Sequence, residues 1–209
     1  MIYLLKLENL KKMYDKNIVL DGISYVFEEN KIYGILGNNG AGKTTLLNCI
    51  SNSIKFEGKV IFEDTDYMVS YVTSPPSLPD FLTPKEILDF FLDKDSTEVL
   101  EDLQIKTDDR NQLIKNCSLG TKNKISFYLC LNSTNKVILL DEPFINLDYN
   151  ARKVAEKQLK EKRDVIVIIS THDFELANDF CDELLLLKNG KLKLIDKNKM
   201  VNLNEIFEN

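Results

Sequence analysis

Residues 37–45 read GNNGAGKTT, a glycine-rich stretch that stands between a strand-like segment and a helix-like segment. The preceding KIYGIL (31–36) is an apolar run typical of a buried strand. The stretch matches the pattern G-x-x-x-x-G-K-[ST] in full. This order of strand, glycine-rich turn and helix start predicts a loop that wraps around phosphate. The alternative is a glycine-rich turn that binds nothing.

The residue types in this loop suit an anion. Glycines allow backbone angles that turn successive N–H groups inward, and the helix start adds unpaired N–H donors and a positive dipole end. Lys43 supplies a point charge for the outer phosphates, and the Thr44 hydroxyl can ligate Mg²⁺. We therefore expect the whole loop to bind phosphate: Gly37, Asn38, Asn39, Gly40, Ala41, Gly42, Lys43, Thr44 and Thr45.

Apolar runs alternate with helix-like segments along the rest of the chain. Further strands are expected at 2–7, 23–27, 59–62, 67–72, 136–140, 164–169 and 183–187, and helices at 43–51, 84–93, 121–131, 150–162 and 173–181. The last three strands are continuous β-branched and leucine runs, typical of parallel strands covered on both faces. Asn189-Gly190 predicts a hairpin turn. We expect one α/β domain over residues 1–209, with a mostly parallel sheet, an antiparallel β region and a helical insertion at about 75–133.

Composition narrows the partners and the compartment. The chain of 209 residues carries a net charge of -6, which disfavours nucleic acid as the main partner. The four cysteines form no C-x-x-C pair and are expected to be reduced core residues. The apolar runs are too short for a membrane span or a signal peptide, so the chain is expected to be soluble and intracellular.

Polar residues follow two of the predicted strands. Asp141 ends the run KVILLD and can hold Mg²⁺ through water, and Glu142 can orient or deprotonate a water that attacks a γ-phosphate. The only histidine, His172, follows VIVIIST at the sheet edge where such folds bind ligands, so its imidazole can contact the γ-phosphate. The alternative for all three is a solvated polar residue at a strand end.

The order of these motifs resembles the ATPase subunit of ATP-binding cassette (ABC) transporters, which are P-loop NTPases, over nearly the whole chain. The family carries an LSGGQ-type signature before the strand with the paired acids, and CSLGT (117–121) stands in that place. Ser118 and Gly120 match, whereas Leu119 replaces a glycine and Thr121 a glutamine. A helix N-terminus here can offer a hydroxyl and N–H groups to phosphate, and a simple serine cap is the alternative.

The resemblance assigns three further residues. Tyr14 is similar to the aromatic residue on which adenine stacks, although plain packing explains a lone tyrosine equally well. Asp148 in FINLD (144–148) matches a residue that crosses the dimer interface. Ser74 stands where the family has a glutamine that reaches the metal and the attacking water, and its shorter side chain can act only through a bridging water.

The resemblance also implies a mechanism and partners. ATP and Mg²⁺ would be bound between two cassettes, identical or different, with Ser118 and Gly120 covering the phosphate loop of the other subunit. A separate membrane permease would hold the chain at the inner face of the cell membrane. The helical insertion would dock on it through Phe81, Leu82 and Phe90, while Ile87, Leu88, Phe91 and Leu92 form the insertion's own core.

Two functions are compatible with these features. The first is transport of a solute, with export favoured because SLGTKNK (118–124) is similar to the cassettes of small exporters and no regulatory domain follows the last strand. The second is an ATP-dependent binding switch or regulator with weak hydrolysis, which Ser74 and the altered CSLGT favour.

Overall fold

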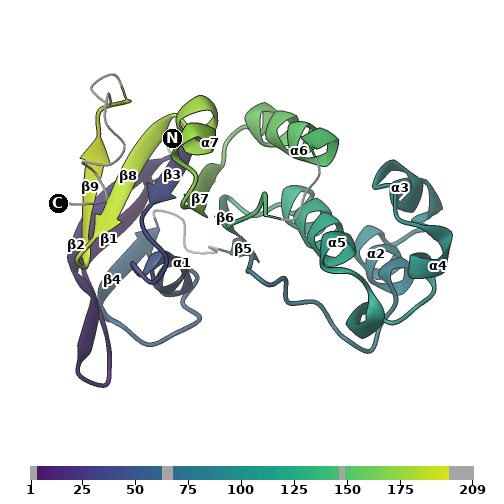
Figure 1. Cartoon of the computed structure of the whole chain (residues 1–209), viewed down its shortest axis with the longest axis horizontal. Coiled ribbons are helices and arrows are strands. Elements are labelled where there is room, and N and C mark those ends of the chain that lie inside the picture. The colour runs from purple at the N-terminus through teal and green to yellow at the C-terminus, as the bar shows by residue number, and fades with distance from the viewer. Residues whose placement is uncertain (1–3, 63–67, 146–148, 198–209) are drawn as a thin grey trace. The chain divides into compact units, whose positions relative to one another are not determined.

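The computed structural model describes residues 4–62, 68–145 and 149–197, which divide into two compact units (Figure 1). The first unit comprises residues 1–71, 135–142 and 159–209, and it contains the sheets. The second comprises residues 72–134 and 143–158, and it is mostly helical. The predicted α/β class is confirmed.

A six-stranded sheet with the order β5-β6-β7-β3-β8-β9 forms the centre of the first unit. The pairs β3–β7, β3–β8 and β6–β7 are parallel, and β8–β9 is an antiparallel hairpin. Its turn residues Asn189 and Gly190 have φ angles of 50° and 73°, as the predicted Asn-Gly hairpin requires. The strands are β3 (Lys31–Leu36), β5 (Val69–Val72), β6 (Val137–Asp141), β7 (Ile166–Thr171), β8 (Glu183–Lys188) and β9 (Lys191–Ile195).

A second sheet, antiparallel and with the order β2-β1-β4, accounts for the predicted antiparallel region. Its strands are β1 (Leu4–Tyr14), β2 (Asn17–Glu28) and β4 (Glu57–Phe62). The first two are much longer than the predicted 2–7 and 23–27. Register shifts after Leu7 and Leu10, with Asn9 at φ 48°, interrupt the apolar alternation without ending the ladder.

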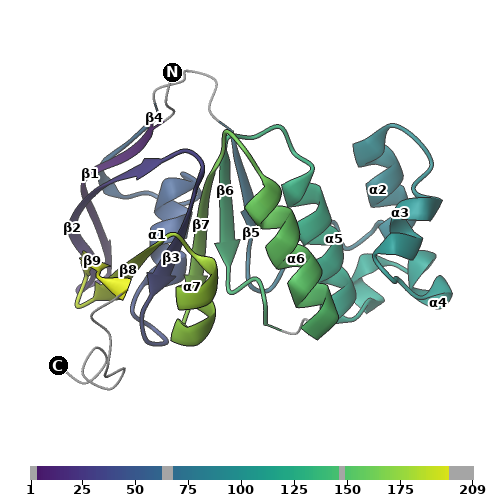
Figure 2. The same cartoon turned by 90° about the horizontal axis from the view of Figure 1, so that it is seen from above.

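Helices cover both faces of the parallel sheet (Figures 1 and 2). A Cβ atom added to Gly34 of β3 would contact Ala177 and Cys181, so this face packs on the α7 side. The neighbouring Tyr33 and Ile35 point to the opposite core, which α1 covers. The two helices are α1 (Lys43–Ile50) and α7 (Phe174–Phe180). All four cysteines are buried thiols, as predicted.

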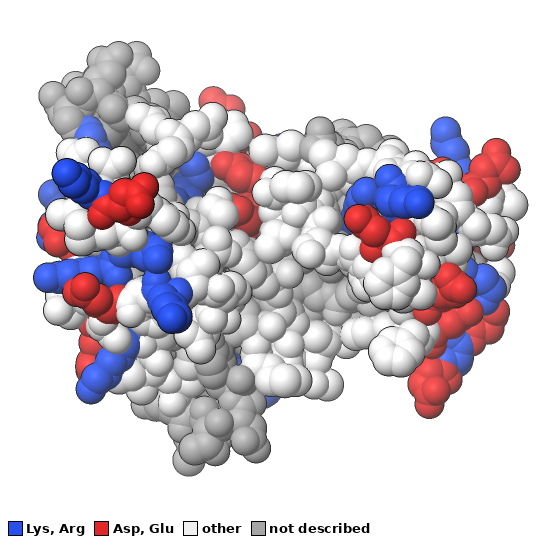
Figure 3. Space-filling view, turned by 90° about the horizontal axis from the view of Figure 1, so that it is seen from below, with Lys and Arg blue, Asp and Glu red and all other residues white. Residues whose placement is uncertain are grey.

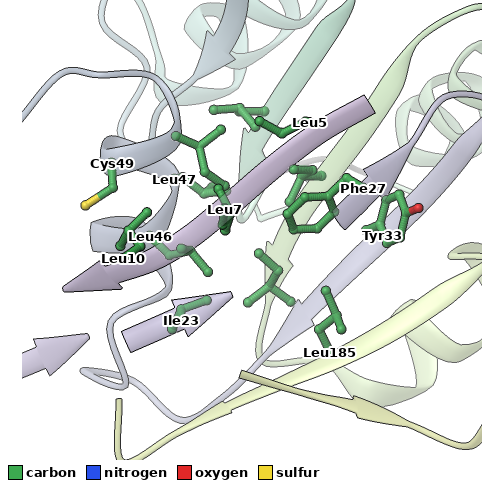
Figure 4. Packing of buried hydrophobic residues seen from close by; sticks show 14 of the residues in the cluster. Leu5, Leu7, Leu10, Ile23, Phe27, Tyr33, Leu46, Leu47, Cys49 and Leu185 are labelled. Atoms are coloured by element: carbon green, nitrogen blue, oxygen red, sulfur yellow. The ribbon is translucent and has the colours of Figure 1, made fainter. Parts of the chain in front are cut away.

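The main hydrophobic core is formed by α1, the sheet that contains β1 and β2, and one face of the parallel sheet (Figure 4). Leu46, Leu47 and Cys49 on one side of α1 pack with side chains of β1 such as Leu5 and Leu7. All of these residues are almost completely buried. Because this core holds α1 against strands on both sheets, it fixes the helix whose first turn follows the glycine-rich loop.

The second unit consists of short helices around a separate small core. They are α2 (Pro84–Leu92), α3 (Thr97–Asp102), α4 (Thr107–Arg110), a 3-10 turn (Ile114–Asn116), α5 (Leu119–Leu131) and most of α6 (Tyr149–Glu161). Helix α2 begins with a capping box, since the Thr83 side chain accepts from the Glu86 N–H and the Glu86 carboxylate accepts from the Thr83 N–H. Helices α3 and α4 were not predicted, because segments of six and four residues are too short to show a readable periodicity.

The apolar residues of α2 divide differently from the prediction. Ile87 and Leu88 are buried in the core of the second unit, as expected. Phe91 is 39 % exposed, so its assignment to that core was wrong. Leu82 is partly buried and packs against the core, and its place on a docking surface stays a prediction. Phe81 and Phe90 are 76 % and 89 % exposed.

A polar cluster joins the start of β3 to the start of β8. Glu183 accepts hydrogen bonds of 2.7 Å from the Tyr25 hydroxyl and from the Lys31 ammonium. Burial alone would raise the pKa of Glu183, but these two donors outweigh burial and hold its pKa below the usual value. The ionised form of Glu183 therefore stabilises the folded chain.

Replacing Glu183 with glutamine is expected to lower the free energy of unfolding at pH 7 by about 1 to 3 kcal/mol, because a charged acceptor of two bonds is lost. The folded-state pKa is depressed, so this contribution is present above about pH 4.5 and is lost as the pH falls further. Urea unfolding at pH 7 and at pH 3 measures both values. Glu57→Gln, on an exposed residue of β4, is the control, and an equal loss at both pH values would contradict the assignment.

Candidate functional site

The glycine-rich loop connects β3 to α1, as the sequence predicts. Gly42 precedes the helix with a left-handed φ of 102°, and a Cβ atom there would come within 2.7 Å of Val19. A Cβ atom on Gly37 would come within 2.7 Å of the Leu187 carbonyl oxygen. Gly40 has a φ of 82°, and no atom lies within 4 Å of where its Cβ would be. Glycine is thus required at Gly37 and Gly42 by packing and at Gly40 by conformation.

Lys43 lies inside this loop. Its side chain is 7 % exposed, and its ammonium donates to the carbonyl oxygens of Gly37 at 2.8 Å and Asn38 at 3.3 Å. The same ammonium lies 3.6 Å from a carboxylate oxygen of Glu142. The loop therefore surrounds one fixed positive charge, and the N–H groups at the start of α1 lie beside it.

Asp141, at the carboxyl end of β6, faces Thr44 across the start of α1. The Thr44 hydroxyl donates to Asp141 Oδ2 at 2.7 Å, and the Ser170 hydroxyl donates to the other carboxylate oxygen. Asp141 is 3 % exposed. Ser170 was not predicted as a site residue, although the pairing of β6 with β7 places it opposite Asp141. Two oxygens of the kind that Mg²⁺ prefers, from Thr44 and Asp141, thus lie together.

Glu142 lies between two nitrogen groups. Its carboxylate is 3.6 Å from the Lys43 ammonium and accepts from His172 Nδ1 at 3.0 Å. Its backbone has a left-handed φ of 49°, and its N–H donates to the Ser170 carbonyl at 3.1 Å. A residue other than glycine rarely adopts this backbone conformation without support from its neighbours. Such residues are common at functional sites. The structure therefore brings Lys43, Glu142 and His172 together.

Tyr14 ends β1 and is 45 % exposed. The Lys12 ammonium lies 4.6 Å from the ring centroid and also donates to the Lys55 carbonyl at 2.8 Å. This cation–π contact restrains the ring and leaves much of it exposed to solvent. Stacking of a base on Tyr14 is compatible with this geometry and stays a prediction.

The other predicted residues belong to the second unit. Ser118 caps α5 by accepting from the Thr121 N–H at 3.1 Å, and the helix begins two residues earlier than predicted. Gly120 lies in the first turn of that helix. Ser74 is exposed and precedes Pro75. The contacts of these residues with a nucleotide or metal stay predictions, and Asp148 lies outside the described residues.

The chain belongs to the ABC transporter family, since residues 20–145 match the sequence profile of that family. The matched residues include the phosphate loop, Asp141 and Glu142, whereas Ser170 and His172 lie beyond them. The chain is therefore an ATP-binding ABC ATPase subunit. Among its described residues, no helix is both long enough and apolar enough to cross a membrane.

Individual relatives agree with this assignment. An uncharacterised ABC transporter ATP-binding protein of Methanocaldococcus jannaschii is 33% identical over 201 residues, which cover 90% of this chain and 75% of that protein. A xylose/arabinose import ATP-binding protein of Sulfolobus acidocaldarius is 30% identical and covers 98% of this chain, with 92% of its own length matched. The solved dimeric, post-hydrolysis structure of an ATP-binding cassette with ADP and Pi has the same fold, with a TM-score of 0.79, 22% identity and coverage of 94% and 100%.

Proposed function

We propose that this chain hydrolyses Mg-ATP to drive a solute through a separate membrane permease, on whose cytoplasmic side it is held. The observation that carries the proposal is the arrangement of Lys43, Thr44, Asp141, Glu142 and His172. These residues converge at the carboxyl ends of three neighbouring parallel strands. Open parallel sheets bind their ligands at this edge.

Thr44 and Asp141 would hold the Mg²⁺ ion. Their oxygens are adjacent, and within the described part of the chain no cluster of three or more His, Cys, Asp or Glu side chains offers a complete metal cage. This fits Mg²⁺, which usually takes one or two protein oxygens and completes its shell with phosphate and water. When bound, the ion neutralises charge on the phosphates.

The remaining groups supply positioning and proton transfer. Lys43 binds the outer phosphates by its charge, and the loop N–H groups hold the phosphate oxygens. Glu142 accepts a proton from the attacking water or orients that water. His172 holds the Glu142 carboxylate through Nδ1 and can contact the γ-phosphate through its other ring nitrogen.

A second cassette, identical or different, would complete the site. Ser118 and Gly120 at the start of α5 would cover the phosphate loop of the other subunit, because a γ-phosphate offers more oxygens than one surface can bind. ATP then favours the closed pair, and loss of the γ-phosphate removes the contacts that favour closure. The similar cassette with ADP and Pi was solved as a dimer, which supports this assembly.

For the direction of transport we favour export, because SLGTKNK (118–124) resembles the cassettes of small exporters, although an import protein is among the relatives. The alternative function is an ATP-dependent binding switch without transport. Co-purification from membranes distinguishes the two. Transport predicts an integral membrane protein that raises ATP turnover when present, and a switch predicts turnover that does not depend on any membrane protein.

Alanine at Phe81 and Phe90 is expected to weaken association with that permease about tenfold or more, since exposed aromatic side chains are frequent anchors of interfaces. In Figure 3, uncharged surface on the helical unit lies beside both acidic and basic side chains. Leu194→Ala, on a residue that is 60 % exposed on β9, is the matched control. Co-purified permease measures association, calorimetry checks that ATP binding is intact, and unchanged association would reject the surface.

A further inference from the structure

A chain of hydrogen bonds leads away from the Ser118 hydroxyl inside the second unit. Ser118 Oγ lies 3.0 Å from Thr121 Oγ1 and accepts from the Thr121 N–H at 3.1 Å. Thr121 Oγ1 in turn lies 3.0 Å from Asp109 Oδ2, and the Gln112 side-chain amide donates to the other carboxylate oxygen. Thr121 is 7 % exposed, so water has little access to its hydroxyl.

The direction of this chain follows from its end group. A carboxylate only accepts hydrogen bonds, so the single proton of the Thr121 hydroxyl points to Asp109. Thr121 Oγ1 can then only accept. In the hydrogen bond between the two hydroxyls, Ser118 is therefore the donor. The Ser118 hydroxyl therefore donates inward and accepts from the helix N–H.

A phosphate oxygen is also only an acceptor, so Ser118 can bind it solely through the proton that Thr121 already takes. We infer that Asp109 and Thr121 are positioning residues that withhold the Ser118 proton and thereby raise the ATP concentration needed to close the pair of cassettes. This inference rests on the proposed role of Ser118 in the second subunit's nucleotide site. Binding of the phosphate costs one internal hydrogen bond.

Two substitutions should release the Ser118 proton by different routes. Thr121→Val keeps the side-chain shape but removes the acceptor. In Asp109→Asn, the amide oxygen can accept from Gln112 and the amide N–H can donate to Thr121, which turns the Thr121 proton toward Ser118 and frees the proton of Ser118. Thr121→Ser keeps the hydroxyl chain and is the matched control. If these hydrogen bonds only stabilised the fold, Thr121→Val and Asp109→Asn would instead raise the ATP concentration needed for association.

The test uses the full chain with Glu142→Gln, which slows hydrolysis, alone and in the complex purified from membranes. Association is followed by sedimentation while Mg-ATP is titrated, and melting temperature monitors the fold. Thr121→Val and Asp109→Asn are each expected to lower the half-maximal ATP concentration on the order of tenfold, the value of one neutral hydrogen bond. Thr121→Ser should leave it unchanged. Ser118→Ala, added to each variant, should remove the gain.

The outcomes separate this inference from the proposed function. The inference alone would be overturned if association stayed ATP-dependent but its half-maximal ATP concentration were unchanged or raised in Thr121→Val and Asp109→Asn. A gain that persists in the presence of Ser118→Ala would do the same, because it would not act through Ser118. Absence of any ATP-dependent association, in the isolated chain and in the complex, would overturn the proposed two-cassette site and the inference together.

Discussion

ATP binding is expected to weaken on the order of a hundredfold or more when Lys43 is replaced by alanine, because charge-assisted bonds to several phosphate oxygens are lost together. The ammonium of Lys43 is held inside the loop by the carbonyl oxygens of Gly37 and Asn38. Isothermal calorimetry with Mg-ATP measures the loss, and phosphate release measures the accompanying loss of hydrolysis.

The control for this prediction is Lys193→Ala, which removes an exposed lysine of β9. It changes the net charge equally but lies outside the loop, so ATP affinity should stay within about twofold. Melting curves of both variants exclude global unfolding as the cause. A Lys43→Ala protein that binds and hydrolyses ATP normally would refute the assignment of the phosphate site.

ATP hydrolysis is expected to fall about a thousandfold in Glu142→Gln, the usual scale for loss of a positioned general base, while ATP binding is retained. Glutamine keeps the shape and the hydrogen-bond acceptor of Glu142 but cannot take a proton. The pair of cassettes should therefore accumulate in its closed form. Single-turnover phosphate release measures the rate, and sedimentation in Mg-ATP measures the closed pair.

The corresponding control is Glu175→Gln, which neutralises an exposed carboxylate in the first turn of α7, three residues after His172. Its hydrolysis rate should be close to that of the unchanged chain. Two results would count against the role of Glu142 as base: a variant that hydrolyses ATP at the normal rate, and a variant that no longer binds ATP.

The parts of the site that could be predicted are those encoded by local chemistry. Three glycines, a lysine and a threonine between a strand and a helix define one loop geometry, and the loop joins β3 to α1 as expected. Asp141 and His172 follow continuous apolar runs, and such runs are readable as buried parallel strands. Parallel strand ends meet at one edge, so their polar residues were expected to gather there.

Features that depend on distant contacts could not be predicted. The extent of β1 depends on bulges that place Asn9 in a left-handed conformation, and the sequence pattern is interrupted at these points. Phe91 lies on the apolar stripe of α2, but this short helix buries only part of that stripe. Asp109 reaches Thr121 across a separation of 12 residues, and no local signal connects them.

The buried Lys43 has a consequence for which anions the loop can select. Its ammonium already has three oxygen neighbours within the protein, from Gly37, Asn38 and Glu142. An incoming anion must therefore compete with rival acceptors, and its affinity is the difference between two sets of contacts. A triphosphate tail can contact the lysine and the loop amides at once, so it gains more contacts than a single sulfate or orthophosphate does. We therefore expect the loop to bind a triphosphate tail more tightly than a single phosphate.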